Sequence, residues 1–503
     1  MSRLTRNIIV NLATNVWSAL LIFIATPLFV RFLGVESYGL IGFYLSLLAI
    51  IGILDTGISA TAVREIAWLA AREDEKCKIP TLLWSLEVVY WGAILILGSL
   101  IIVWAWFIGG NWFHSKELSF DQLRTALMLM AVSLVVQVPS GLYLGGLVGL
   151  QRQVEASRIM AFFSTLRVVG ALMVLWLVGP DIRYFFIWQI VASVLQTGGM
   201  RWALWRQLYR ERMGTRFSTA AIMSIRGVAV GITIITALSL VMSQADKMLL
   251  SRLVPLDVLG YYMLAWTVAS GLSRVVTPLM QAYGPHFTEL ISRGREKEIA
   301  VKIRLASQLV NVLILPPAII LILLAEPILY AWTGNQAVAF ATAPILMVVT
   351  VGTVLSSCAF PAMSLLYGRK LIRPVLVLNI LAAIILMPLL VIAVFRYGGM
   401  GAACFWAAYG AFLYIGTQTL GLRTFNNDSV MKPIVRDLVA PCVAAFAIIL
   451  PITRLFDEIE STIHLVVFLA SLLLASWLVA MLAAGSLRQV AIERLGWRIR
   501  INR

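Results

Sequence analysis

The chain has 503 residues, of which 61% are hydrophobic and 13% are charged, and its mean hydropathy is +0.92. Soluble domains are about 45–50% apolar and about 25% charged, so this composition excludes a water-soluble fold. The formal net charge is +16, but the basic residues recur between hydrophobic runs and do not form one patch with interleaved aromatic residues. This pattern argues against a nucleic-acid partner and favours cytoplasmic loops that contact anionic membrane lipids.

Metal-binding, disulfide and nucleotide-binding motifs are missing from the sequence. The cysteines have no CxxC spacing, the histidines are isolated, and there is no GxxxxGK[ST] phosphate loop. We therefore expect no metal and no cofactor. The residues concerned are Cys77, Cys358, Cys404, Cys442, His114, His286 and His464.

Apolar segments long enough to cross a bilayer recur along the whole chain. A helix needs about 20 apolar residues to cross about 30 Å of hydrocarbon. The first segment is too long for a cleavable signal peptide and is followed by no small-residue cleavage site. The sequence therefore predicts an all-α polytopic membrane protein with about fourteen transmembrane helices. The predicted spans are 7–32, 38–69, 80–108, 122–149, 156–178, 183–205, 222–252, 257–290, 299–325, 339–367, 373–395, 400–422, 434–455 and 462–484.

The basic residues give these spans an orientation. Of the 40 Lys and Arg residues, about 30 fall at one face of the membrane, 7 at the other and 3 within it. Positive residues are retained on the cytoplasmic side, so we expect both termini to be cytoplasmic.

An internal repeat divides the predicted spans. Residues 31–40 (RFLGVESYGL) and 252–261 (RLVPLDVLGY) occupy matching turns, and Gly39 precedes Gly260 by 221 residues. Pro139 and Pro361 are 222 residues apart, each within a span rich in small residues. Nearly equal offsets indicate two six-helix lobes, although chance similarity between apolar helices is the alternative. The predicted domains are an N-lobe at 1–205, a basic cytoplasmic linker at 206–221, a C-lobe at 222–424, and a helix pair with a basic tail at 425–503.

Specific motifs accompany this repeat. Residues 27–40 (PLFVRFLGVESYGL), 54–58 (LDTGI) and 64–67 (REIA) occur in the first two spans, and 243–250 (SQADKMLL) and 259–262 (LGYY) occur in the seventh and eighth. Together they resemble the polysaccharide transporter, or O-antigen flippase-like, family of the multidrug/oligosaccharidyl-lipid/polysaccharide exporter superfamily. The resemblance covers nearly the whole chain, with Leu253-Val254 standing where the second turn would carry Leu-Gly.

The resemblance implies a cavity between two lobes that opens alternately to each side of the bacterial inner membrane. The implied cargo is a polyprenyl diphosphate-linked oligosaccharide, which is moved from the cytoplasmic to the periplasmic leaflet for synthesis of O-antigen, capsule or exopolysaccharide. An ion gradient or the membrane potential would drive transport, and polysaccharide assembly proteins are possible partners. The chain would then not be an enzyme.

Charged residues within the predicted spans are the first candidates for cargo contacts, because each costs roughly 2.5–3.5 kcal/mol near the bilayer centre. Arg167 lies about eleven residues into the fifth span, and its guanidinium could bind a phosphate with two hydrogen bonds. The alternative is an ion pair with Asp55 or Glu87. Those two carboxylates lie on neighbouring antiparallel spans and could form an ion-coupled gate, or instead pair with Arg64 or Arg167.

The second lobe and the span ends supply further candidates. Asp246 and Lys247 are adjacent, so on a helix they point about 100° apart and are not expected to pair with each other. Asp246 is a gating candidate, and Lys247 is either a phosphate contact or a snorkelling side chain. Arg274, Arg31 and Arg64 are cavity-mouth candidates or interfacial anchors.

Three prolines within spans are hinge candidates, namely Pro139, Pro278 and Pro361, because proline removes a backbone donor and can bend a helix. Ordinary packing kinks would give the same pattern.

Three other functions compete with the flippase. A membrane-embedded glycosyltransferase or polymerase would carry catalytic carboxylates outside the membrane, which the predicted periplasmic segments around 109–121 and 326–342 largely lack. A multidrug exporter would favour acidic sites for cationic drugs. A peptidoglycan-precursor flippase would share the anionic cargo.

Overall fold

The computed structural model describes residues 3–208, 216–219, 223, 240–424, 431–452, 462–485 and 487–488. Within these ranges the secondary structure is helical, apart from an isolated bridge between His114 and Pro255. The all-α prediction is therefore confirmed.

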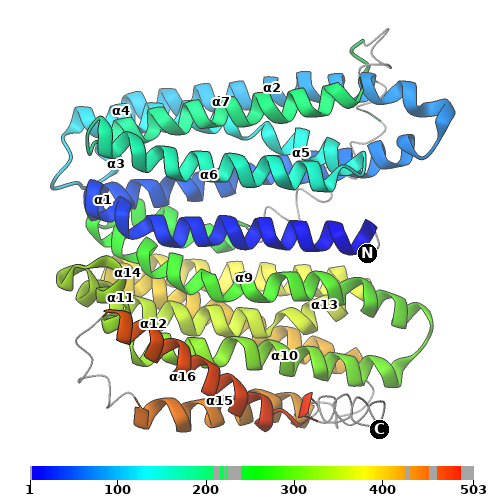
Figure 1. The fold of residues 1–503 in the computed structure, drawn as a ribbon, viewed down its shortest axis with the longest axis vertical. Helices are drawn as coiled ribbons and strands as arrows, with labels where there is room; N and C mark the ends of the chain where they lie inside the picture. The colour runs from blue at the N-terminus through cyan, green and yellow to red at the C-terminus, as the bar shows by residue number, and fades with distance from the viewer. Residues whose placement is uncertain are drawn as a thin grey trace. The chain divides into compact units, whose positions relative to one another are not determined.

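The elements follow one another along the chain as in Figure 1. They are α1 (Arg3–Ala70), η1 (Glu73–Lys78), α2 (Ile79–Trp104), η2 (Ala105–Gly109), α3 (Gly110–Trp112), α4 (Phe120–Gln137), α5 (Ser140–Gly149), α6 (Gln153–Leu177), α7 (Ile182–Gln207), α9 (Leu256–Ser292), α10 (Glu296–Leu323), α11 (Ala325–Thr333), α12 (Gln336–Cys358), α13 (Phe360–Gly368), α14 (Ile372–Thr424), α15 (Met431–Ile452) and α16 (Thr462–Ala483). Residues 240–253 are also helical.

These helices match the predicted spans in order. In the described ranges, seven helical segments are long and apolar enough to cross a membrane, and two shorter apolar helices lie at 438–451 and 467–483. Each predicted span coincides with one helix, with half of an interrupted helix, or with two consecutive helices. The exception is span 222–252, most of which lies outside the described residues. The chain is a multi-pass membrane protein.

Two of the long helices each contain a reversal of the chain. In α1, Gly34 has a φ of 80°, and the Thr26 and Tyr38 hydroxyl oxygens lie 3.5 Å apart. Residues twelve apart on a straight helix would be separated by about 18 Å, so the chain must turn back between them. In α14, Gly398 has a φ of 54°, and a Cβ on Gly416 would lie 2.3 Å from the Leu378 side chain. Positive φ at both turns is readily adopted only by glycine.

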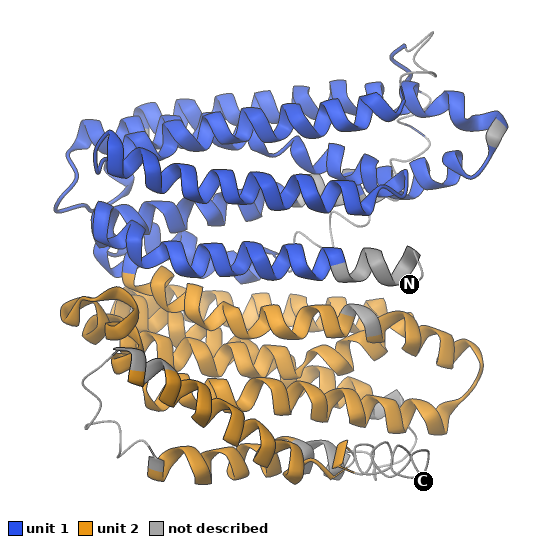
Figure 2. Cartoon of the chain, in the orientation of Figure 1, with its two compact units in different colours: residues 1–260 blue, residues 261–503 orange. Residues whose placement is uncertain are grey.

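The chain forms two compact units, residues 1–260 and 261–503, which Figure 2 colours separately. The first unit contains α1 to α7 and the helix at 240–253, and α6 packs there against both α1 and α7. In the second unit, α12 packs closely on α14 and α10. The predicted linker at 206–221 lies largely outside the described residues, so its bounds stay predictions.

Each unit contains a broken helix at the position of its repeated proline. Helix α4 ends at Gln137 and α5 begins after Pro139, while α12 ends at Cys358 and α13 begins with Phe360-Pro361. Around the first break, the Val136 carbonyl accepts a hydrogen bond from the Thr197 hydroxyl, at 2.7 Å. Side chains can thus satisfy carbonyls near a break that has no access to water.

The C-terminal pair, α15 and α16, is attached to α10. Its apolar interface contains Ile319 and Ile320 of α10, Ala445 and Ile449 of α15, and Leu472 of α16. The Trp477 indole donates to the Leu313 carbonyl at 3.3 Å, which adds a polar contact to α10. The predicted terminal pair therefore packs as an addition to the second unit.

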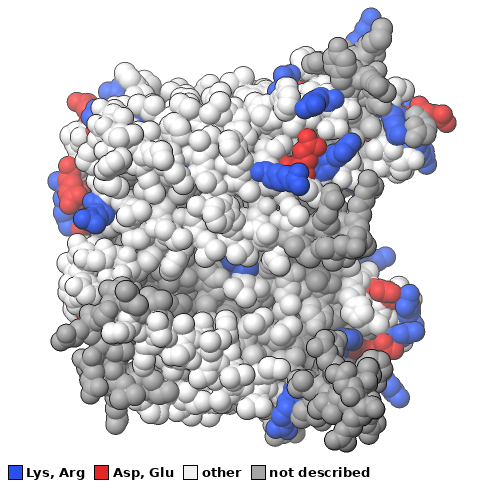
Figure 3. Space-filling view, viewed as in Figure 1, with Lys and Arg blue, Asp and Glu red and all other residues white. Residues whose placement is uncertain are grey.

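Charged side chains gather mainly at the helix ends of each unit, and the visible face between them is largely uncharged (Figure 3). Large apolar side chains are exposed on these helix faces, among them Phe107, Trp176 and Phe395, at 73%, 72% and 80%. Such surfaces are unfavourable in water and are expected where lipid is the solvent.

The two repeated turns pack against each other through their glycines within the first unit. A Cβ on Gly39 would lie 2.7 Å from the Leu256 carbonyl oxygen, and a Cβ on Gly260 would lie 2.3 Å from the Val35 carbonyl oxygen. Each glycine thus faces the carbonyl four residues before the other glycine. This reciprocal contact leaves no room for a side chain at either glycine.

Gly260→Ala is expected to destabilise the protein by about 1–3 kcal/mol, because its methyl group must displace backbone rather than a flexible side chain. Thermal unfolding in detergent, followed by tryptophan fluorescence, measures the effect. Gly271→Ala is the matched control on the same helix, α9, because a Cβ there has no atom within 4 Å. Equal melting temperatures for the two variants would show that the crossing tolerates a side chain.

Candidate translocation site

Arg167 of α6 lies in a network of glutamine side chains inside the first unit. Its Nη1 donates to the Oε1 atoms of Gln137 and Gln189, at 2.6 and 3.2 Å, and its Nη2 donates to Oε1 of Gln196 at 2.7 Å. Gln137 is the last residue of α4, and the other two glutamines belong to α7. The three amides therefore hold the guanidinium between α4, α6 and α7.

The second half of α1 joins the same network. The Tyr44 hydroxyl donates to Oε1 of Gln137 at 2.7 Å and lies 3.0 Å from the Ser133 hydroxyl. Gln137 thus accepts from both Tyr44 and Arg167, which fixes its amide oxygen toward the guanidinium. Gln189 and Tyr44 are buried, so these members of the network are shielded from solvent.

Arg167 has no carboxylate partner among the side chains that the structure describes. Its three acceptors are neutral amides, and Glu87, one of the two predicted partners, binds elsewhere. The other predicted partner, Asp55, has a side chain outside the described residues. Amide oxygens satisfy guanidinium hydrogens but leave the field of the cation unneutralised, so the site favours an anion.

Glu87 of α2 is part of a separate structural cluster. Its carboxylate forms an ion pair with Arg201 of α7 and accepts hydrogen bonds from the Tyr143 hydroxyl, at 2.8 Å, and the Trp205 indole, at 3.2 Å. The Trp91 indole donates to Tyr143 at 3.0 Å. Glu87 therefore joins α2, α5 and α7, and its observed partner is neither of the predicted arginines.

Asp246 and Lys247 form an ion pair, so the prediction that these adjacent residues do not pair is wrong. The Lys247 ammonium lies 3.1 Å from Oδ1 and 3.2 Å from Oδ2 of Asp246, and it donates to the Ser243 carbonyl at 2.9 Å. Both side chains are almost fully buried, with 1% and 0% exposed. Burial makes pairing strongly favourable, and the flexible lysine stem bends back to reach its neighbour. Lys247 consequently presents no surface to cargo in this conformation.

The other predicted cavity residues do not join the Arg167 network. Arg31 and Arg64 of α1 are exposed, as is Arg274 of α9 in the second unit. Exposed basic side chains fit interfacial anchoring as well as a cavity mouth. Among the hinge candidates, Pro139 and Pro361 lie at helix breaks, whereas Pro278 lies inside the continuous helix α9.

Glu36 is a buried carboxylate that stabilises one end of the first unit. It accepts hydrogen bonds from the Ser115 hydroxyl, at 2.6 Å, and from the backbone N–H groups of Lys116 and Glu117, at 3.0 and 3.1 Å. Lys116 in turn pairs with Asp257 at 2.8 Å. The segment 115–117 thereby ties the turn at Gly34 to the start of α9.

Sequence reasoning missed most of these partners, although one signal was present. Gln137, Gln189 and Gln196 are amides within apolar spans, and an amide in hydrocarbon requires a hydrogen-bond partner. Finding that partner needs the relative rotation of three helices, which periodicity does not supply. Glu36 lies within the motif at 27–40, but the sequence does not indicate which donors surround it.

Comparisons with known proteins agree with this architecture. The family model described as polysaccharide biosynthesis protein matches residues 4–291, and the MatE model matches residues 231–392. The chain belongs to the polysaccharide biosynthesis protein family. This confirms the resemblance read from the motifs at 27–40 and 243–250, and it makes the chain a transporter of the exporter superfamily. No curated protein matches the chain in sequence.

Solved structures share the fold of this family member. The lipid II flippase MurJ in an inward closed conformation aligns with a TM-score of 0.67 at 14% identity, covering 98% of each chain. An inward-facing multidrug resistance MATE transporter aligns with a TM-score of 0.67 at 16% identity, covering 84% of this chain and 99% of its own. A superfamily transporter from Pyrococcus furiosus, whose binding pocket is described as having reverse polarity, aligns with a TM-score of 0.57 at 14% identity, covering 86% and 95%.

Glu36→Ala is expected to lower the free energy of unfolding by about 1–3 kcal/mol, because several donors lose their buried acceptor. Thermal unfolding in detergent tests this expectation. Glu117→Ala is the control, since the Glu117 side chain is exposed while its backbone N–H still donates to Glu36. If both alanine variants melt with the parent protein, the Glu36 cluster contributes nothing to stability.

Proposed function

We propose that this transporter is a flippase for polyprenyl diphosphate-linked oligosaccharides, and that Arg167 contacts the diphosphate during translocation. The cargo would pass from the cytoplasmic to the periplasmic leaflet of a bacterial inner membrane by alternating access, for surface polysaccharide synthesis. Both termini would be cytoplasmic, and an ion gradient or the membrane potential would supply the energy.

The observation that carries the proposal is the intramembrane cation held by neutral amides. A diphosphate needs positive charge along its path, because an isolated anion is very unfavourable in hydrocarbon. A guanidinium already neutralised by a carboxylate would offer less attraction. Arg167 is instead held by three glutamine oxygens, so an arriving phosphate could displace one amide and gain a charge-assisted hydrogen bond.

The family supports a carbohydrate-linked cargo, since its model is described as a polysaccharide biosynthesis protein. A second candidate is export of a peptidoglycan precursor, which the alignment with a lipid II flippase over 98% of both chains favours. Both cargoes are polyprenyl diphosphates. They differ in the attached head group, so direct comparison of the two lipids separates the candidates.

The primary experiment reconstitutes the protein in liposomes that contain a fluorescent polyprenyl diphosphate oligosaccharide, and measures how fast an outside quencher reaches it. The proposed function predicts faster exposure with protein than with empty liposomes, and a smaller effect for lipid II. Preference for lipid II would support the second candidate. No acceleration for either lipid would reject both.

Arg167→Ala is expected to slow flipping by about tenfold or more, because one or more charge-assisted hydrogen bonds to phosphate are lost. Arg167→Lys should retain part of the activity, since it keeps the charge but loses the two-pronged geometry. Arg183→Gln is the control, because Arg183 pairs with Asp181 at the start of α7 and is not one of the residues that hydrogen-bond to Arg167. Parent-like rates for Arg167→Ala, at equal amounts of folded protein, would rule out the cargo role.

Gln196→Glu provides a test that nearly preserves side-chain shape. The substitution places a carboxylate where the amide oxygen now lies 2.7 Å from Nη2 of Arg167. We expect thermal stability to be maintained by the new ion pair, and flipping to slow because the cation is neutralised. Thermal unfolding and the quencher assay together measure the two effects. Normal flipping with the ion pair in place would show that the free charge is not required.

A further inference from the structure

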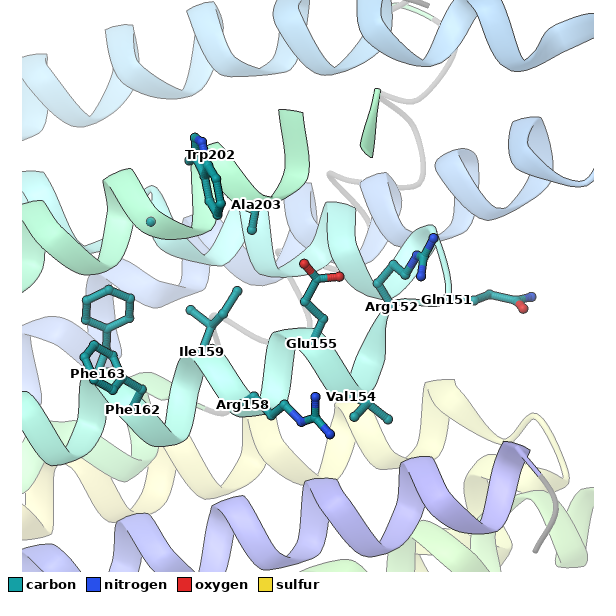
Figure 4. A pocket seen from close by; sticks show the side chains of 11 residues that line it. Gln151, Arg152, Val154, Glu155, Arg158, Ile159, Phe162, Phe163, Trp202 and Ala203 are labelled. Carbon is teal, nitrogen blue, oxygen red and sulfur yellow. The ribbon is translucent and has the colours of Figure 1, made fainter. Parts of the chain in front are cut away.

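An amphipathic groove follows the contact between α6 and α7 in the first unit. It has a volume of about 670 Å³. Figure 4 shows its lining, with Gln151 and Arg152 at one end, Phe162 and Phe163 at the other, and Trp202 and Ala203 contributed by α7. The groove is separate from the glutamine side chains that hold Arg167, and no part of the proposed translocation path uses it.

One glycine of α7, Gly199, belongs to the lining of this groove. A Cβ on Gly199 would lie 3.0 Å from the ring of Phe163. A larger residue at this position would therefore press on Phe163 in the apolar half of the groove.

The polar half of the groove carries more positive than negative charge. Arg152 and Arg158 are exposed and, within the described part of the chain, neither forms an ion pair. Glu155 lies between them in sequence and lines the same groove, where its carboxylate points toward α7 (Figure 4) and accepts a hydrogen bond from Gln207 at 3.3 Å. The lining therefore carries two arginines and one glutamate, which leaves an excess of one positive charge.

The apolar half has the character of a lipid contact. Phe162 and Trp202 are 63% and 64% exposed, and aromatic rings of this kind favour the region between head groups and acyl chains. The polar end of the groove coincides with the predicted cytoplasmic end of the fifth span. The charged lining residues would therefore lie near the membrane surface, and the aromatic lining residues would lie deeper in the membrane. A soluble anion would use the arginines but would leave the aromatic wall uncovered.

We propose that this groove is a binding site for an anionic phospholipid of the cytoplasmic leaflet. The phosphate head group binds at Arg152 and Arg158, and an acyl chain lies along Ile159, Phe162 and Trp202. Basic pockets between transmembrane helices on the cytoplasmic side bind anionic head groups for the same electrostatic reason. The lipid braces the α6–α7 contact one helical turn from Arg167, because Phe163 precedes Arg167 by four residues on α6.

The test measures binding of dioleoyl phosphatidylglycerol to the purified full-length protein by native mass spectrometry. Dioleoyl phosphatidylcholine, inorganic phosphate and undecaprenyl phosphate are the comparison probes. We expect phosphatidylglycerol to bind more tightly than phosphatidylcholine, and Arg152→Gln with Arg158→Gln to weaken it by about fivefold per arginine. Phe162→Gln should weaken it too, because the acyl chain loses an apolar contact.

Arg72→Gln is the matched control, because Arg72 is an exposed arginine paired with Glu75 and stacked on Trp68, outside the groove lining. It should leave phosphatidylglycerol binding unchanged. Equal binding to the parent and the double arginine variant would overturn the proposal. The proposal would also fail if inorganic phosphate displaced phosphatidylglycerol as effectively as unlabelled phosphatidylglycerol does. It would fail as well if undecaprenyl phosphate bound and phosphatidylglycerol did not. None of these outcomes depends on whether the protein flips an oligosaccharide.

Discussion

In the hydrocarbon of a membrane there is no water to hydrogen-bond to a polar group, so each polar group must find a partner within the protein. This requirement shapes much of the structure. Where Pro139 breaks the helix between α4 and α5, the Val136 carbonyl is satisfied by Thr197. Glu36 is buried because backbone N–H groups and a serine hydroxyl meet it. The break at Pro139 and the buried Glu36 are tolerated because polar partners from other segments of the first unit meet them.

The intramembrane charges are satisfied in two different ways. Glu87 with Arg201 and Asp246 with Lys247 are matched by opposite charge. The first pair joins α2 to α7, whereas the second lies within the single helix at 240–253. Removing one member would leave an uncompensated charge, so such pairs resist change. Arg167 pairs with no carboxylate among the described side chains and donates to three neutral amide oxygens, which can be exchanged for a stronger acceptor. The ion pairs therefore suit a structural role, whereas the Arg167 site suits transient binding of an anion.

Much of the fold could be predicted because the signals were local. Apolar length located the helices and placed turns between them at 33–37 and 396–399, and the repeated prolines lie at the two breaks at Pro139 and Pro361. The partners within the site could not be predicted in the same way. Which glutamine meets Arg167 depends on helix rotation and packing between segments that are 22 to 30 residues apart along the chain.

The error at Asp246 and Lys247 has a similar physical origin. A helical separation of about 100° describes the directions of the Cα–Cβ bonds, whereas the lysine charge lies at the end of four flexible methylene groups. At a position exposed to water, the direction of the Cα–Cβ bond would often determine where the lysine ammonium group lies. In a fully buried position, the attraction between opposite charges decides instead.

The reciprocal packing of Gly39 and Gly260 limits which residues the two turns can accept. Each glycine faces the backbone of the other turn, so the space available at one turn is set by the chain path of the other. A larger residue at either position could be accommodated only if the backbone of the opposite turn moved. Substitutions at these two positions are therefore coupled, although the residues lie 221 positions apart in the sequence.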